Sequence, residues 1–482
     1  MKTIYLSFLT FFLAVSYTHA QSETSYSTET AAEIKQVEEN LCTWVKTQDI
    51  DKWTLEERME YYGVNGVSIA VVKDYKILWA KGYGFADVSE KRKVDENTLF
   101  QAASISKSLN ALGVLKLAQD KKIDLDSDIN NYLKSWKFPY DTLSKGKKIT
   151  VANLLSHTGG TTVHGFPGYT PGKKLPSTIN ILNGEKPANT EAVRSEAVPG
   201  EKFNYSGGGT TITQLIITDV AGQTYADYMW QNVLQPIGMT ASSYDQPSKK
   251  PASLLATGYY TDGTKIKGKY HVYPEQAAAG LWTTPADLCK YIIEMQLSLK
   301  GNSNKVLTQE NTNKMVTPVL PKSEAGLGVF IEKKGSDSYF QHGGANEGFR
   351  CQYYGSLENG NGVVVMVNSD NGSIINEIIN SVAQTYNWPD YYEPVTKTVV
   401  SLPENTLNEY AGKYKNDEAS FSIIKKDGNL YIQLRDVTQR MYFTSETEFF
   451  RMENPNSPKF IRSEEGKVKG IMFNGSFFVP KV

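Results

Sequence analysis

Residues 100–118 constrain the fold and the chemistry of this chain more than any other stretch. Apolar residues recur at helical spacing from 109 to 118, which predicts a helix with a buried face. Ser104 and Lys107 are three residues apart at its start, so a helix places them one turn apart on the same face. The helix dipole favours a nucleophile at this end, and a lysine in an apolar setting is a candidate proton acceptor. The stretch therefore predicts a nucleophile with its own base within reach.

The S-x-x-K pattern by itself is weak evidence, because short motifs also occur by chance. The pattern recurs at Ser144/Lys147 and at Ser422/Lys425. The first of these pairs lies in a charged Ser-Lys-Gly-Lys-Lys loop, and the second lies in an alternating, strand-like segment. Neither pair opens an amphipathic helix, so we interpret both as chance matches.

The overall composition is that of a globular protein without a strongly charged surface. Charged residues make up 21% of the 482 positions, and the formal net charge is -1. Because lysine and arginine do not cluster, we expect no nucleic-acid partner and predict a small-molecule or peptide substrate. A chain of this length is expected to hold more than one domain, and its oligomeric state is left open.

Cysteine usage gives no sign of a disulfide-stabilised fold. Cys42, Cys289 and Cys351 are far apart and form no C-x-x-C motif. Their odd number excludes a fully paired framework, and we predict buried free thiols. Whether any two of them form a disulfide stays open at this point.

The first twenty residues have the pattern of a secretory signal peptide. A lysine at position 2 precedes an apolar run at 4–15, and Thr-His-Ala ends the segment before Gln21. No later stretch is long and apolar enough to span a bilayer. We therefore expect export to the periplasm or the medium, and a mature chain without an integral membrane segment.

The remainder of the chain divides by pattern into four parts. Residues 21–62 predict a helical leader, and residues 63–390 predict a mixed α/β domain. A linker is expected at 391–405, which runs from Tyr-Tyr-Glu-Pro to Pro-Glu-Asn and holds two prolines. From 406 to 482 the apolar period changes to two between glycine-containing turns, which predicts a small antiparallel β-barrel or sandwich.

Periodicity also predicts individual elements within the α/β domain. The expected strands lie at 67–70, 76–82, 325–331, 349–354 and 362–369. The expected helices lie at 149–156, 210–220, 226–235, 281–297 and 374–386, with Thr150 and Thr284 as N-caps. The loop-rich stretch 160–200 is expected to cover a site as a flap.

Two glycine-rich motifs follow the Ser104 stretch. Tyr205 precedes a serine and the three glycines at 207–209, where a helix is expected to begin. Residues 341–349 run Gln-His-Gly-Gly-Ala-Asn-Glu-Gly-Phe and lead into an expected strand. Glycine has no side chain, so the backbone can approach a ligand closely there. Residues 154–159, Leu-Leu-Ser-His-Thr-Gly, lie between the Ser104 stretch and the Tyr205 motif.

In this order, S-x-x-K, Y-x-x and H-x-G, the motifs resemble those of the serine β-lactamase-like family. That family comprises class C β-lactamases, D-Ala-D-Ala carboxypeptidases, and related D-aminopeptidases and esterases. The resemblance covers about residues 63–386. It implies an α/β fold in which helices flank an antiparallel sheet, with an all-helical subdomain. Residues 406–482 resemble, by composition, the lipocalin-like domain appended to some of these hydrolases.

The resemblance implies a role for each matched residue. Ser104 would attack an acyl carbonyl and form an acyl-enzyme, while Lys107 and Tyr205 would share the proton transfers. The backbone N–H groups of Ser104 and Ala345 would form the oxyanion hole. His342 stands where β-lactamases carry a lysine, and would contact a substrate carboxylate or complete the proton network. No cofactor or metal is implied.

Two departures from the family pattern bear on the substrate. The tyrosine motif usually ends in an asparagine that binds a substrate amide, and Gly207 takes that place here. The third motif is His342-Gly343-Gly344, which lacks the ammonium and the hydroxyl that hold a β-lactam carboxylate. Both departures favour an esterase or peptidase over antibiotic hydrolysis.

Other interpretations stay open at this point. A true class C-type β-lactamase is the first alternative, and a non-catalytic penicillin-binding-like sensor is the second. Tyr205 alone is also typical of a packing tyrosine, and His157 is expected to fix the loop after its helix. A metal site built on His157 and His164 is disfavoured, because no third ligand is evident. The β tail is a further candidate for docking a partner or shielding the site.

Overall fold

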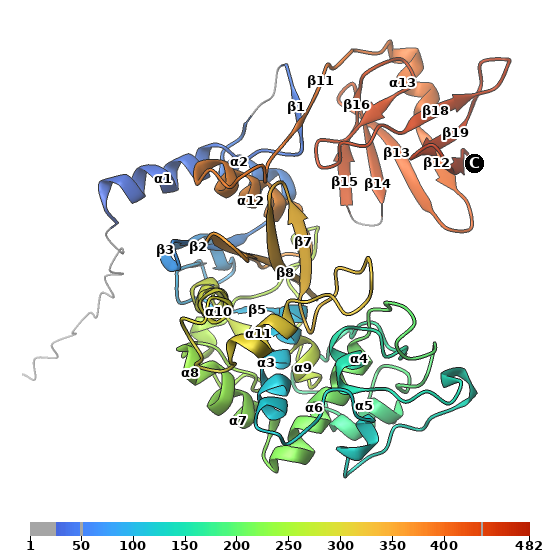
Figure 1. The fold of residues 1–482 in the computed structure, drawn as a ribbon. Helices are drawn as coiled ribbons and strands as arrows, with labels where there is room; N and C mark the ends of the chain where they lie inside the picture. Colours follow the sequence, from blue (N-terminus) through green and yellow to red (C-terminus); the bar gives the residue numbers. More distant parts are fainter. Residues whose placement is uncertain (1–25, 49–51, 435–436) are drawn as a thin grey trace, which may run out of the picture.

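The computed structural model describes residues 26–48, 52–434 and 437–482. The predicted signal peptide at 1–20 lies outside these residues. The described chain forms an α/β body and a C-terminal lobe of strands (Figure 1).

A seven-stranded antiparallel sheet is the centre of the larger body. Its strand order is β4-β3-β2-β10-β9-β8-β7, so strands from the two ends of the body pair side by side. The strands are β2 (Gly66–Lys73), β3 (Lys76–Asp87), β4 (Arg92–Lys93), β7 (Phe330–Lys334), β8 (Asp337–Asn346), β9 (Phe349–Ser356) and β10 (Gly362–Val367).

Both faces of this sheet are covered by helices (Figure 1). One face packs against α1 (Thr28–Glu39), α2 (Leu55–Tyr62) and α12 (Ile374–Thr385). The other face packs against α10 (Pro285–Leu299) and the helices below it. Strand β2 is apolar at most positions because both of its faces are buried. Val67, Ile69 and Val71 belong to the first layer, whereas Ala70 and Val72 belong to the second.

Below the sheet lies a helical region, joined to it by the short pair β5 (Phe100–Gln101) and β6 (Trp282–Thr283). Its helices α3 and α6 are buried on nearly all sides, which fits their mixed small and apolar sequences. The helices are α3 (Ser106–Gln119), α4 (Val151–Leu155), α5 (Thr178–Asn183), α6 (Gly207–Ala221), α7 (Tyr225–Met229), α8 (Gln235–Ile237), α9 (Gln276–Ala279) and α11 (Gln309–Met315). No helix among the described ranges is both long and apolar enough to cross a bilayer.

The expected elements of the α/β domain are present with three differences. Trp282 and Thr283, inside the helix expected at 281–297, form β6, so that α10 begins only at Pro285. Thr150 and Thr284 cap α4 and α10 as predicted. The strand expected at 325–331 begins only at Phe330, because a turn with a left-handed Gly328 precedes it. Strand β8 was not expected, since its paired glycines have weak strand propensity. Pairing with β9 along its length holds it in the sheet.

The helical leader is interrupted by a strand. After α1 ends, β1 (Val45–Thr47) pairs in parallel with β11 (Val395–Lys397), and α2 follows. β11 lies in the stretch predicted as a linker at 391–405. Local periodicity does not reveal this pairing, because the partner strand is more than three hundred residues away.

The C-terminal lobe is all-β apart from α13 (Glu404–Tyr410), as the change of period predicts. Isolated bridges, Tyr414 with Lys481 and Glu448 with Lys459, connect its sheets in series. No closed barrel is found in the part of the lobe that the structure describes. The sheets are β12 (Gly412–Lys415), β13 (Ser420–Lys426), β14 (Asn429–Leu434) and β15 (Val437–Arg440); β16 (Tyr442–Phe443) and β17 (Phe449–Phe450); and β18 (Lys459–Arg462), β19 (Val468–Phe473) and β20 (Phe477–Pro480).

Candidate active site

Ser104 lies in a tight turn immediately before α3. The turn is a 3₁₀ segment, Ala103–Ile105, and Ala103 has a left-handed φ of 48°. Lys107, in the first turn of α3, places its Nζ 3.0 Å from Ser104 Oγ. The structure thus brings together the two residues that the S-x-x-K pattern pairs, at hydrogen-bond distance.

The Lys107 side chain is buried and held in place from three directions. It is 4% exposed, and its Nζ donates to the backbone oxygen of Ala278 in α9 at 2.8 Å. The same Nζ lies 5.0 Å from the centre of the Tyr205 ring. Ser104, Ala278 and Tyr205 therefore surround the amine and fix its position.

Tyr205 stands directly before α6, and the start of that helix is well capped. The Ser206 side chain accepts the backbone N–H of Gly209 at 2.9 Å, as an N-cap serine does. The Tyr205 ring lies 4.3 Å from the ring of His157 and 6.3 Å from that of His342, between ring centroids. The tyrosine is thus in a layer of rings beside Lys107.

Strand β8 passes close to the turn that carries Ser104. A Cβ on Gly344 would lie 2.3 Å from the Ala102 backbone oxygen and 2.4 Å from Cys351 Sγ. Only glycine fits at such an approach. Gly343, Gly344 and Ala345 line the same cleft as Ser104.

His342 is a buried neutral imidazole. Its Nδ1 lies 2.6 Å from the Gly343 backbone oxygen, which can only accept, so Nδ1 carries the proton. Burial, and then the nearby Lys107 charge, lowers the His342 pKa to about 3. Its Nε2 lone pair has no hydrogen-bond partner among the described residues. His342 therefore offers an acceptor and no positive charge at neutral pH.

A cleft of about 710 Å³ opens above Ser104. Aromatic side chains of Phe203, Tyr205 and Phe330 line part of it, together with His342. The remaining residues are mostly small or polar. They are Gln341, Gly343, Gly344, Ala345, Arg350, Cys351, Gln352, Gly372, Ile375 and Asn376.

Gly207 is not among the residues that line this cleft. It is buried at the start of α6, where an added Cβ would lie 2.7 Å from the ring of Phe166. Phe166 belongs to the loop-rich stretch 160–200. The absence of a side chain at Gly207 therefore makes room for that loop.

Several cleft residues carry no signal in the sequence motifs. Phe203 precedes α6, and Phe330 is the first residue of β7. Sequence periodicity does not fix where these two elements begin. Arg350 and Gln352 are two residues apart on β9, so the expected strand at 349–354 places them on one face. The sequence does not reveal that this face borders the cleft. His157 does not line the cleft but packs on the Tyr205 ring, and the Leu-Leu-Ser-His-Thr-Gly stretch does draw attention to it.

No metal site is found in the ranges that the structure describes, since no three His, Cys, Asp or Glu side chains converge there. All three cysteines are buried and free, as predicted. Burial raises the pKa of the Cys351 thiol, which donates to Ala102 O. The cysteines therefore present no activated thiolate.

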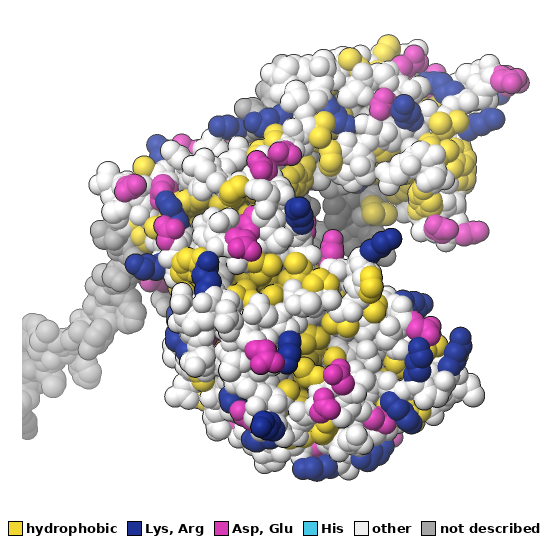
Figure 2. All heavy atoms as spheres, in the orientation of Figure 1, with side chains coloured by type: hydrophobic (Ala, Val, Ile, Leu, Met, Phe, Trp, Pro, Cys, Tyr) yellow, Lys and Arg dark blue, Asp and Glu magenta, His cyan; other side chains and the backbone are white. Residues whose placement is uncertain are grey.

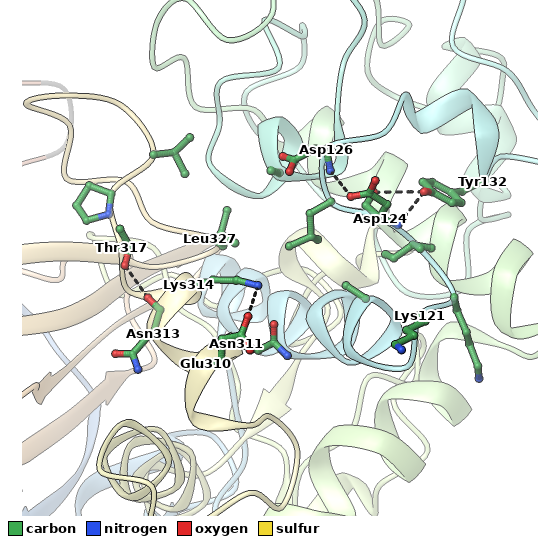
Figure 3. A pocket seen from close by; sticks show the side chains of 17 residues that line it. Lys121, Asp124, Asp126, Tyr132, Glu310, Asn311, Asn313, Lys314, Thr317 and Leu327 are labelled. Atoms are coloured by element: carbon green, nitrogen blue, oxygen red, sulfur yellow. Dashed lines mark hydrogen bonds and ion pairs between the residues drawn. The ribbon is translucent and has the colours of Figure 1, made fainter.

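A larger groove, of about 1150 Å³, lies between the end of α3 and α11. Figure 2 shows apolar side chains in a hollow on this side of the molecule, bordered by charges of both signs. In Figure 3, Glu310 pairs with Lys314, and Asp124 lies beside Asp126 and Tyr132. The groove brings together no nucleophile and base, so the smaller cleft is the candidate active site.

Comparison with known proteins identifies relatives along most of the chain. The profile of the beta-lactamase family matches residues 53–378. Protein flp of Staphylococcus aureus (strain N315) is 26% identical over 379 residues, spanning 76% of this chain and 70% of that protein. The octameric penicillin-binding protein homologue from Pyrococcus abyssi has a TM-score of 0.62 at 22% identity, covering 89% of this chain and 98% of that one.

A further solved structure, D-amino acid amidase from Ochrobactrum anthropi SV3 with D-phenylalanine, has a TM-score of 0.58 at 21% identity. It covers 75% of this chain and 100% of that one. These structures confirm the predicted α/β fold class. The family profile spans Ser104, Lys107, Tyr205 and His342, and extends over more than half of the sequence. This chain belongs to the beta-lactamase family.

Proposed function

We propose that this protein is an exported serine hydrolase that cleaves an ester or amide bond through an acyl-enzyme on Ser104. The observation that carries the proposal is the 3.0 Å contact between Ser104 Oγ and the buried Lys107 Nζ. A nucleophile with a base in hydrogen-bond reach is what covalent acyl transfer requires. Membership of the beta-lactamase family supports the same chemistry.

The proton transfers follow from the contacts of Lys107. The 3.0 Å contact would let the Lys107 amine take the Ser104 proton while it still donates to Ala278 O. Ser104 Oγ then bonds to the substrate carbonyl carbon, and the bond to the leaving group breaks as Lys107 or Tyr205 returns the proton to it. Water attacks the acyl-enzyme in the second half-reaction and restores Ser104.

Backbone N–H groups are proposed to stabilise the developing oxyanion. Those of Ser104 and Ala345 belong to residues that line one cleft, and Gly344 lets β8 approach the Ser104 turn. Such a donor contributes about 3 kcal/mol to transition-state stabilisation. Gly343 and Gly344 would also leave the backbone of β8 open to a substrate.

The lining of the cleft favours a substrate without a carboxylate at the His342 position. His342 is neutral there and cannot replace the ammonium that binds a β-lactam carboxylate. It fits the other role considered for it, an acceptor in the proton network. An ester or a D-amino-acid amide or peptide is the substrate class we favour. The similarity to D-amino acid amidase supports this class.

β-Lactam hydrolysis is the second candidate, because the penicillin-binding protein homologue from Pyrococcus abyssi shares the fold. A non-catalytic binding protein is the remaining alternative. The three functions differ in turnover, so one series of measurements separates them.

The test measures the intact mass of the mature protein after exposure to a fluorophosphonate. We expect one adduct on the wild type, mapped to Ser104 and absent from Ser104→Ala. Ser422→Ala is the matched control, because Ser422 belongs to a second S-x-x-K pattern on strand β13. That variant should be labelled like the wild type.

Turnover assays complete the assignment. Hydrolysis of p-nitrophenyl esters or D-amino-acid amides that is lost in Ser104→Ala supports the proposal, and rapid nitrocefin turnover supports a β-lactamase. An adduct without turnover of any substrate indicates a binding protein. An unlabelled wild type contradicts the proposal.

Export is proposed from the pattern at residues 1–20. Cell fractionation of the full-length chain, followed by N-terminal sequencing, should find the protein outside the cytoplasm with Gln21 as its first residue. Retention of the whole chain in the cytoplasm would contradict this part of the proposal.

We also infer that residues 406–482 form a domain related to the lipocalin-like type, with sheets that do not close into a barrel in the described residues. The support is a series of antiparallel sheets around an aromatic core that includes Tyr410, Phe443 and Phe460. Deleting residues 401–482 tests whether the lobe acts on the cleft. Unchanged activity and substrate range would exclude that role.

A further inference from the structure

The short segment that carries Tyr205 is held at three consecutive residues by two histidines. The backbone oxygen of His157 accepts the Asn204 N–H at 2.7 Å, and His157 Nδ1 accepts the Ser206 N–H at 3.2 Å. Between them, His164 Nδ1 donates to the Tyr205 backbone oxygen. Backbone groups on either side of the tyrosine side chain are thus fixed by His157 alone.

The His157 ring also packs on the tyrosine ring itself. The ring centroids of His157 and Tyr205 are 4.3 Å apart, with an interplanar angle of 35°. Burial, and then the charge of Lys107, holds the His157 pKa well below its usual value, so the ring is neutral. Because Nδ1 accepts from Ser206, the ring proton is on Nε2.

The backbone at His157 also favours this arrangement. His157 ends the turn after α4 with a left-handed φ of 56°. The next residue, Thr158, accepts the backbone N–H of Gly200 at 2.8 Å. The turn after α4 and the segment before α6 are therefore joined at several points, with His157 at the point nearest the tyrosine.

We propose that His157 is a positioning residue for Tyr205, which holds the phenol ring beside Lys107 by two backbone hydrogen bonds and one ring contact. The proposal rests on the function proposed above. A displacement of a catalytic group by about 1 Å can lower a rate by about 10²-fold, so loss of these contacts should be visible in catalysis.

His157 does not act on the substrate or on a metal in this account. It is not among the residues that line the cleft, and the structure shows no hydrogen bond between it and Ser104. Its Nδ1 is occupied by Ser206, and no third metal ligand lies near it in the described part of the chain. Its effect must pass through Tyr205.

Three variants separate the contacts that His157 makes. His157→Ala removes the ring and the acceptor, His157→Phe keeps only a ring, and His157→Asn keeps an acceptor and tolerates the left-handed backbone. His271→Ala is the matched control, because His271 bonds a backbone oxygen through Nδ1 at Pro167, outside the tyrosine segment. Thermal melting of each variant verifies that it is folded.

The measurements are the rate of Ser104 labelling by a fluorophosphonate and the kinetics of p-nitrophenyl acetate hydrolysis. We expect His157→Ala to lower the labelling rate and kcat by about 10²-fold, with KM little changed. His157→Asn should recover a larger part of the activity than His157→Ala, and His271→Ala should match the wild type.

A double-mutant cycle with Tyr205→Phe distinguishes positioning from a general structural effect. If His157 acts through the phenol, His157→Ala should have little further effect once the hydroxyl is absent. An equal loss in both backgrounds, or wild-type activity of His157→Ala, overturns the proposal.

A wild type that a fluorophosphonate does not label overturns the proposed function instead. The inference is then decided by the crystal structure of His157→Ala. The Tyr205 ring is expected to leave its place beside Lys107 in that variant. A ring that stays where it is overturns the proposal.

Discussion

Glu275 is a buried carboxyl group that no catalytic role explains. It lies directly before α9, whose Ala278 oxygen holds Lys107, and neither of its carboxyl oxygens has a hydrogen-bond partner among the described residues. Burial raises the Glu275 pKa from 4.5 to about 8. The side chain is therefore mostly protonated at neutral pH.

The protonation of Glu275 predicts that the protein loses stability as the pH rises. Its folded-state pKa of about 8 exceeds the unfolded value of 4.5, so the folded state binds the proton more tightly. The contribution is complete below pH 4.5, declines above it, and is lost above pH 8. Glu275→Gln removes this titration. As the pH rises from 4.5 to above 8, the unfolding free energy of the variant should increase relative to that of the wild type by on the order of 3–5 kcal/mol.

Urea denaturation at several pH values measures that difference. Glu358→Gln, at an exposed glutamate, is the control and should follow the wild type. A Glu275→Gln curve parallel to that of the wild type across the range would show that this carboxyl group does not titrate with a raised pKa.

At the level of single residues, the sequence predicts which residues lie together at the candidate site but not their charge states. Ser104 and Lys107 are predicted from their spacing on one helix, and Tyr205 from the order of the motifs along the chain. The neutral state of His342 depends on burial and on a backbone oxygen, which the motif does not specify. Gly207 likewise has a packing reason, the ring of Phe166, that only the folded loop reveals.

Strand β8 is the element whose backbone position matters most to the cleft. Gly344→Ala would place a methyl group 2.3 Å from the Ala102 oxygen and 2.4 Å from Cys351 Sγ. Because backbone must then move, we expect a loss of about 1–3 kcal/mol in stability. Separation of β8 from the Ser104 turn should also lower fluorophosphonate labelling about 10²-fold.

The neighbouring glycine provides the comparison for stability. A Cβ on Gly343 would meet the end of the Gln352 side chain at 2.6 Å, and that side chain can move. Gly343→Ala should therefore unfold close to the wild type in urea, whereas Gly344→Ala should not. Equal stability of the two variants would contradict the close approach of β8.

Elements with a clear local pattern were predictable, including β2 and β10, which pair with each other across the chain, and strands without such a pattern were not. α4 and α10 begin at threonine caps that the sequence displays. β8 is held in the sheet by β9, which follows it directly in a hairpin, and β1 is held by β11, more than three hundred residues away. A strand that carries glycines has no local signal strong enough to compete with that of a loop.

At the scale of the whole molecule, the leader lies between the sheet and the C-terminal lobe. Arg58 in α2 donates to Glu377 in α12 at 2.7 Å, and both side chains are buried. The Tyr62 hydroxyl faces the carboxylates of Glu377 and of Glu453 in the lobe, and its single proton can be donated to one at a time. A buried charge network thus joins the two parts.

An apolar cluster accompanies this network and gives the last prediction. Val45 of β1 is buried together with Phe450 and Met452 of the lobe. If the lobe packs on the leader in solution, Val45→Ala and Phe450→Ala should couple, with an interaction energy of about 0.5–3 kcal/mol in unfolding free energy. Phe460 is the control, because it is equally buried but belongs to the core of the lobe itself. Val45→Ala and Phe460→Ala should be additive, and additivity of both pairs would show that the two parts do not share this core.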